Sequence, residues 1–128
     1  MLLRVTVRSF GINVLLNLVL HPFLPIAFFV PMGVGFATGW DIRARPSDGV
    51  AIGLLMGLFM LLLVCVVGTG FLLLVDAARF WWIVLAIASL AVAHVALFSG
   101  FGAALGGHLS RREDAVQAEA APALPVAE

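Results

Sequence analysis

Apolar residues fill three long blocks of the chain, and two short polar segments, DIRARPSDG and DAAR, separate the blocks. The blocks cover residues 9–40, 50–75 and 80–109. A membrane-spanning helix needs about 20 apolar residues and tolerates roughly 17 to 25. The second block therefore predicts one membrane-spanning helix at the long end of that range. The third block is longer still and predicts one membrane-spanning helix whose glycine-rich end runs into the interface. The aromatic run FWW at the start of the third block is typical of a membrane interface.

The first block is too long for one simple span, and Pro22, Pro25 and Pro31 interrupt it. Proline removes a backbone hydrogen-bond donor and biases the residue before it away from helical geometry. The block is therefore either one kinked helix or a hairpin of two short helices that turns at HPFLP. In the hairpin, the two helices cover about residues 7–21 and 25–40.

The distribution of arginine favours the hairpin, because arginine in short loops prefers the cytoplasmic side of a membrane. A single crossing of the first block would divide the seven arginines 4 to 3, whereas the hairpin places six on one side and only Arg79 on the other. We therefore predict an all-α integral membrane protein. It is expected to be a four-helix bundle with a short, proline-broken first hairpin and both termini in the cytoplasm, and three spans are the alternative.

Composition agrees with a multi-pass protein of the cell membrane. The chain is 63% hydrophobic and 11% charged, with a mean hydropathy of +1.18, whereas a soluble domain is normally about 45 to 50% apolar. Residues 1–110 are expected to form one transmembrane domain in the lipid bilayer. The tail, residues 111–128, is rich in alanine and proline and is expected to be disordered in the cytoplasm. No A-x-A-like cleavage site follows the first apolar run, so the N-terminus is expected to be retained.

A polar stripe runs along the first predicted helix. Ser9, Asn13, Asn17 and His21 are spaced four residues apart, and at about 100° per residue such positions share one face of a helix. The stripe has three interpretations. It can hold the helix against a neighbour by hydrogen bonds, or form one wall of a polar pathway or a lipid-headgroup site. In the third, Ser9 and His21 are simply exposed near the two membrane surfaces.

Glycines at a spacing of four residues form stripes on the other predicted helices. These are Gly35 and Gly39, then Gly49, Gly53 and Gly57, and finally Gly102 and Gly106. Small residues let helices approach closely in lipid, where van der Waals contact replaces the hydrophobic drive. The stripes therefore predict helix packing, either within a dense monomer or between the copies of a homo-oligomer.

The order of these features resembles a family of small four-helix, glycine-rich prokaryotic membrane proteins of unknown function. The matching segments are HPFLPIAFFVPMGVGFATGW, the loop RPSDG, the glycine helix GVAIGLLMG and the closing GFGAALGGHLSRR. The resemblance covers most of residues 10–112 and implies four helices with both ends cytoplasmic. It carries over no catalytic residue. Pro31 and the three histidines are not part of the family's pattern.

Residues suited to catalysis or metal binding are few. His21, His94, His108 and Cys65 lack the spacing of a metal site, although a single histidine can ligate a haem axially. His94 falls within the last predicted span, where a hydrogen bond from the imidazole to a backbone carbonyl is expected. No nucleophile has a base nearby, and no basic block suits nucleic acid. We therefore expect no catalytic residue, no metal, no cofactor, no nucleic-acid partner and no enzymatic activity.

Two functions fit these features. The first is a structural or accessory membrane protein that packs through its glycine stripes with itself or with other membrane proteins. The second is a small oligomeric pore or transporter, including a holin-like protein. The two functions differ in whether Asn13 and Asn17 face a neighbouring helix or a water-filled path.

Overall fold

The computed structural model describes residues 2–20, 24–75 and 77–120. These residues form helices and no strands. In chain order the elements are α1 (Leu2–Leu20), α2 (Leu24–Asp41), α3 (Pro46–Leu74), the short 3-10 helix η1 (Ala78–Phe80) and α4 (Trp81–Ala120). The all-α prediction is confirmed. The first apolar block forms two helices, as the hairpin interpretation predicted, with residues 21–23 outside the described part of the chain.

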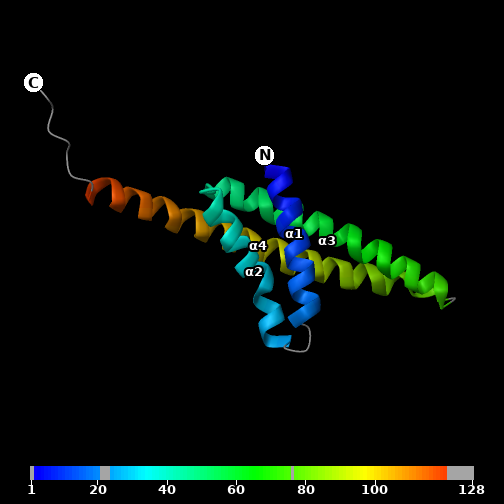
Figure 1. The fold of residues 1–128 in the computed structure, drawn as a ribbon. Helices are drawn as coiled ribbons and strands as arrows, with labels where there is room; N and C mark the ends of the chain where they lie inside the picture. The colour runs from blue at the N-terminus through cyan, green and yellow to red at the C-terminus, as the bar shows by residue number, and fades with distance from the viewer. Residues whose placement is uncertain (1, 21–23, 76, 121–128) are drawn as a thin grey trace, which may run out of the picture.

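Two helical hairpins cross one another (Figure 1). Helices α3 and α4 lie side by side along most of their length, and the pair of α1 and α2 crosses them obliquely. The start of α1 lies near the connection between α2 and α3 (Figure 1). Successive contacts between α2 and α4 advance in the same direction along both helices, so these two helices run parallel, whereas α3 runs antiparallel to α4.

Three of the helices are long and apolar enough to cross a membrane: α1, α3 and α4 through Glu119. Helix α2 has 18 residues, contains Pro31 and ends at Asp41. At about 1.5 Å per residue it is about 27 Å long, a little less than the hydrocarbon thickness of about 30 Å. A complete crossing by α2 therefore leaves little room for tilt.

Three helix ends differ from the predicted ones by more than one residue: the starts of α1 and α3 and the end of α4. Helix α1 begins at Leu2 rather than residue 7, and α3 begins at Pro46, where the Arg45 amide donates to Asp48 Oδ2 over 2.9 Å. Helix α4 continues to Ala120 instead of ending near residue 109. The prediction of a disordered tail is therefore wrong for residues 111–120, while residues 121–128 lie outside the described part.

The extension of α4 has a local cause and a long-range cause. Its residues include alanine, arginine and glutamate, which have high helix propensity. It is also tied to the connection between α2 and α3, because Arg43 Nε lies 2.7 Å from Asp114 Oδ2. The composition of the tail suggested disorder, and composition alone could not show this long-range contact.

Every glycine of the predicted stripes packs inside the chain. A methyl group at Gly35, Gly39 or Gly53 would overlap a backbone carbonyl of α4, from Ser99, Ala103 and Ala96 respectively. Gly102 and Gly106 of α4 approach backbone carbonyls of α2 as closely. The approach of α3 to α4 is looser at Gly49 and Gly57, where a Cβ would lie 2.9 Å from Ala104 N and 3.1 Å from Ala96 Cβ respectively. The stripes thus bring α2, α3 and α4 together as one tightly packed unit, which we call the glycine core.

Apolar side chains complete the glycine core. Val30 and Val34 of α2, Ile52 and Met56 of α3, and Val95 and Ala103 of α4 form one buried cluster. Ile52 and Met56 are completely buried. Helix α1 contributes only partly buried side chains to this cluster, including Phe10. The core therefore belongs to three helices, and α1 lies at its edge.

Candidate functional site

Helix α1 is joined to α2 by a hydrogen bond between two buried polar side chains. Its buried residues are Thr6, Ser9 and Asn13. Ser9 Oγ lies 2.6 Å from Thr38 Oγ1 of α2, and both side chains are buried. The hydroxyl of Thr38 donates its one proton to the Val34 carbonyl over 2.7 Å, so Ser9 is the donor in the bond between the helices. Ser9 therefore holds α1 against a neighbouring helix by a hydrogen bond, which is the first of the three interpretations of the polar stripe.

The two asparagines of the stripe bond to each other along α1. The Asn17 amide nitrogen donates to the Asn13 backbone carbonyl over 3.0 Å and to Asn13 Oδ1 over 3.1 Å. Asn13 is only 2% exposed. Among the described residues, neither asparagine side chain donates a hydrogen bond to another helix. His21, the last member of the stripe, lies outside the described part of the chain.

Asn13 and Asn17 line a cavity of about 340 Å³. His94 of α4, which follows Asn17 by 77 residues in the sequence, lines the same cavity. We call this space the polar cavity. Its remaining walls are apolar and come from all four long helices: Val14, Leu18, Pro31, Met60, Leu63, Ala91 and Val95. Asn13 and Asn17 of the polar stripe therefore lie at the same cavity as His94 of α4, which the spacing of residues along the sequence could not show.

His94 is surrounded by aromatic rings. The centroid of its imidazole lies 4.2 Å from that of Phe28 and 4.7 Å from that of Phe98. Within the described ranges the imidazole has no hydrogen bond to a backbone carbonyl, so the partner expected for it is not found there. Pro31, which is fully buried at the same cavity, lacks the amide that would otherwise bond to the Ala27 carbonyl.

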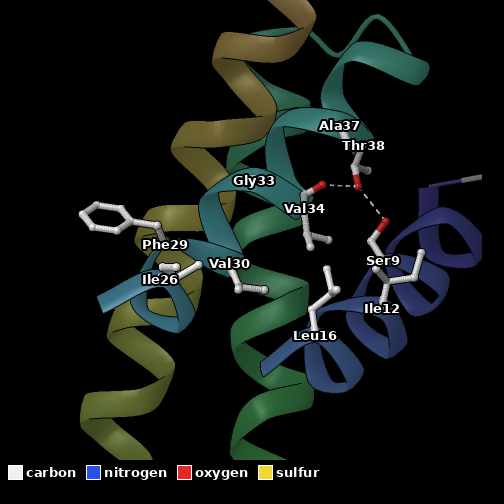
Figure 2. Close-up of a pocket in the computed structure, with 10 residues that line it drawn as sticks. All are labelled: Ser9, Ile12, Leu16, Ile26, Phe29, Val30, Gly33, Val34, Ala37 and Thr38. Atoms are coloured by element: carbon white, nitrogen blue, oxygen red, sulfur yellow. Dashed lines mark hydrogen bonds between the residues drawn. The ribbon is translucent and has the colours of Figure 1, made fainter. Parts of the chain in front are cut away.

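A second hollow lies between α1 and α2 (Figure 2). This hollow, the α1–α2 groove, has a volume of about 450 Å³. Its lining is almost entirely apolar: Ile12 and Leu16 of α1, and Ile26, Phe29, Val30, Gly33, Val34 and Ala37 of α2, with Ser9 and Thr38 at one end. The hydrogen bond from Ser9 to Thr38 therefore marks the polar end of an apolar groove.

The groove continues past Ser9 and Thr38 into a wider hollow of about 860 Å³, which we call the charged mouth. Its lining includes Arg8 of α1 and Trp40 and Asp41 of α2. Both charged side chains belong to exposed residues. The groove and the mouth share Ser9, Ile12, Ala37 and Thr38, so they are two parts of one slot.

Metal chemistry gains no support from the geometry. In residues 2–20, 24–75 and 77–120, no group of three His, Cys, Asp or Glu side chains could hold a metal ion. Cys65 is a free thiol on α3.

Comparisons of the chain with protein-family models, with curated proteins and with solved structures find no match. The resemblance to a small four-helix family stays a prediction.

Proposed function

We propose that the chain is a multi-pass protein of the cell membrane with a structural or accessory role and no enzymatic activity. It acts by associating with itself or with another membrane protein, and both termini are cytoplasmic. The observation that supports this role is the contrast between the glycine core and α1. The core uses its glycines within the chain, whereas α1, at the edge of this core, presents an apolar face with Gly11 in its middle. Exposed apolar side chains also lie on α2, α3 and α4.

The uncovered face of α1 is formed by Val7, Gly11, Leu15 and Leu18, spaced at helical intervals. Val7 is 50% exposed, Leu15 61% and Leu18 74%. No heavy atom lies within 4 Å of the position that a Cβ at Gly11 would occupy, apart from its own surroundings in the helix. A glycine among large apolar side chains lets a second helix approach closely. This face of α1 is therefore the surface on which we place the association.

Energy transfer between labelled copies in liposomes tests the association. Gly11→Ile should reduce the transfer several-fold, because the β-branched side chain holds the second helix away. Gly70→Ile is the matched control, since Gly70 of α3 is also exposed and has no neighbour within 4 Å. Transfer no higher than that of randomly distributed copies would contradict self-association. Equal effects of the two substitutions would contradict the placement on α1.

A partner of another kind is tested by photo-crosslinking in native membranes. A crosslinker at Leu15 should capture one defined membrane protein in addition to, or instead of, a second copy. Leu74, which is 87% exposed at the end of α3, provides the control position. Identical product patterns from both positions would indicate random collisions in the bilayer and would argue against an accessory role through α1.

A small oligomeric pore or transporter is the second candidate, and the polar cavity is the observation that favours it. Two carboxamides and an imidazole share this cavity among apolar walls, and polar groups within membrane spans commonly mark solute or ion pathways. Purified protein reconstituted into liposomes separates the two functions. The accessory role predicts no flux of ions or small solutes above that of empty liposomes, and sustained flux would establish the pore instead.

A further inference from the structure

The slot between α1 and α2 is apolar at one end and charged at the other. The α1–α2 groove, at about 450 Å³, lies within the usual range of ligand pockets, about 300 to 1,000 Å³. It opens past Ser9 and Thr38 into the charged mouth with Arg8 and Asp41. An apolar groove that ends at charged groups matches a molecule with an apolar chain and a charged head.

The two charges of the mouth come from different helices and have opposite signs. Arg8 is on α1 and Asp41 is the last residue of α2. Within the described part of the chain, neither side chain forms an ion pair. Trp40, which is 39% exposed, lies beside them and is a typical residue of the membrane interface. The mouth thus offers one cationic and one anionic group to a ligand at the level expected for lipid headgroups.

The hydroxyl groups at the junction cannot replace Arg8 as donors to an anion. Thr38 donates its proton to the Val34 carbonyl, and Ser9 donates its proton to Thr38. Ser9 therefore presents only acceptor lone pairs to the slot. The charged donor available to an anion is the guanidinium of Arg8, and the charged acceptor available to a cation is the carboxylate of Asp41.

We propose that this slot binds a zwitterionic glycerophospholipid whose headgroup carries a primary ammonium, such as a phosphatidylethanolamine. The phosphate pairs with Arg8, the ammonium donates hydrogen bonds to Asp41, and one acyl chain lies in the α1–α2 groove. A phosphatidylglycerol has no cation for Asp41, and a quaternary ammonium cannot donate hydrogen bonds. The inference rests on the proposed membrane location, but it does not require self-association.

Lipid competition tests the headgroup preference. The purified full chain is mixed with equal amounts of phosphatidylethanolamine and phosphatidylglycerol with identical acyl chains, and native mass spectrometry counts the lipids that remain bound. We expect a preference of about tenfold for phosphatidylethanolamine, the size of one charge-assisted hydrogen bond. Asp41→Asn should remove most of this preference, and Arg8→Gln should lower the retention of both lipids. Arg112→Gln, an exposed arginine on α4 outside the slot, should change neither.

Blocking the groove tests where the acyl chain lies. Ile12→Trp fills the α1–α2 groove, whereas Leu15→Trp places the same ring on the uncovered face of α1. Only Ile12→Trp should reduce the number of retained lipids, several-fold. Both substitutions are at exposed positions, and thermal unfolding of each variant confirms that it is folded.

The results separate failure of this inference from failure of the membrane role. Equal retention of both lipids by the wild type, or equal effects of Ile12→Trp and Leu15→Trp, overturns the lipid site. Alkaline extraction of the chain from cell membranes tests the membrane location independently. A chain that resists extraction but shows no headgroup preference refutes the lipid site alone, whereas a chain that is released into solution refutes both.

Discussion

At the scale of single residues, the helices approach one another most closely at glycines, which have no side chain. Gly53 and Gly70 both belong to α3, but their surroundings are opposite. A Cβ at Gly53 would overlap the Ala96 carbonyl and lie 2.9 Å from Gly100 Cα, whereas a Cβ at Gly70 would have no neighbour within 4 Å. The same substitution at the two positions therefore isolates the effect of helix approach from the effect of helix propensity.

We predict that Gly53→Ala lowers the free energy of unfolding by about 1 to 3 kcal/mol, because α4 must move to admit the methyl group. Gly70→Ala should leave stability unchanged or raise it by up to about 1 kcal/mol, since alanine favours a helix over glycine. Thermal unfolding of both variants in detergent measures the difference. Equal shifts would show that α3 and α4 do not approach closely at Gly53.

Asn13 and Asn17 bond to each other rather than to another helix. Within the described part of the chain, replacing both with leucine therefore leaves no group on a neighbouring helix without its hydrogen-bond partner. We predict that the double variant Asn13→Leu with Asn17→Leu is as stable as the wild type or more stable, since leucine is favoured in membrane spans by several tenths of a kcal/mol per residue.

Ser9→Ala is the contrasting variant, because it removes the hydrogen bond between α1 and α2. Hydrogen bonds between membrane helices contribute about 0.6 kcal/mol on average and up to about 1.7, so this variant should be less stable than the wild type by an amount in that range. Thermal unfolding in the same detergent compares all three proteins. A clear loss of stability in the asparagine double variant would mean that the two side chains hold a partner on another helix.

The sequence predicted that Ser9, Asn13 and Asn17 share one face of a helix, but it did not predict their partners. A spacing of four is a property of one helix, so the polar stripe could be recognised directly. The partner of Ser9 lies 29 residues away on α2, and His94 reaches the polar cavity from α4. The pairing of Ser9 with Thr38 depends on the register of α1 against α2, and the approach of His94 depends on the crossing of the two hairpins. No local pattern encodes either arrangement. The charged mouth was missed for the same reason, because Arg8 and Asp41 meet only in the folded chain.

At the scale of elements, Arg111 of α4 holds the connection between α2 and α3 by hydrogen bonds. Arg43 has a φ of 51°, which is uncommon for a residue with a side chain. Arg111 of α4 donates to the carbonyl of Arg43 over 2.9 Å and also to that of Ala44. The last helix thus satisfies carbonyl groups that follow the end of α2.

We predict that Arg111→Gln loosens this connection. Hydrogen bonds from a charged donor contribute about 1.5 to 3 kcal/mol, and the partial exposure of Arg111 reduces this to about 1 kcal/mol, or about fivefold in local opening. Hydrogen exchange of the amides of residues 42–44 should accelerate by about that factor. Arg112→Gln, the exposed neighbour, should leave the exchange unchanged, and equal rates in both variants would show that Arg111 does not hold the connection.

The number of helices and most of their ends were predictable, but the starts of α1 and α3 and the end of α4 were not. Prolines, glycines and charged loops are local signals, so they indicated four helices and the division of the first block. Helix ends depend on contacts across the molecule. The Arg43–Asp114 ion pair and the bonds of Arg111 lie beyond the predicted end of the last helix, and these contacts accompany its extension to Ala120.

At the scale of the whole molecule, an even number of alternating helices returns the chain to the side on which it began. Helix α2 runs parallel to α4 and α3 antiparallel to it, and the start of α1 lies near the connection between α2 and α3 (Figure 1). If all four helices cross, Arg4, Arg8, Arg43, Arg45, Arg111 and Arg112 share one side, and Arg79 alone lies on the other.

We predict that this arginine-rich side is cytoplasmic, because arginine in short loops is retained there during insertion. Reporter fusions at the N-terminus, after residue 45, after residue 78 and at the C-terminus should report inside, inside, outside and inside. The fusion at residue 78 is the internal control, since it alone should report the opposite side. An outside N-terminus, with the other three fusions unchanged, would mean that α1 and α2 together cross the membrane only once. The short α2, with Pro31 at its centre, would then enter the bilayer without spanning it, and the arginine bias would no longer explain the orientation of the first hairpin.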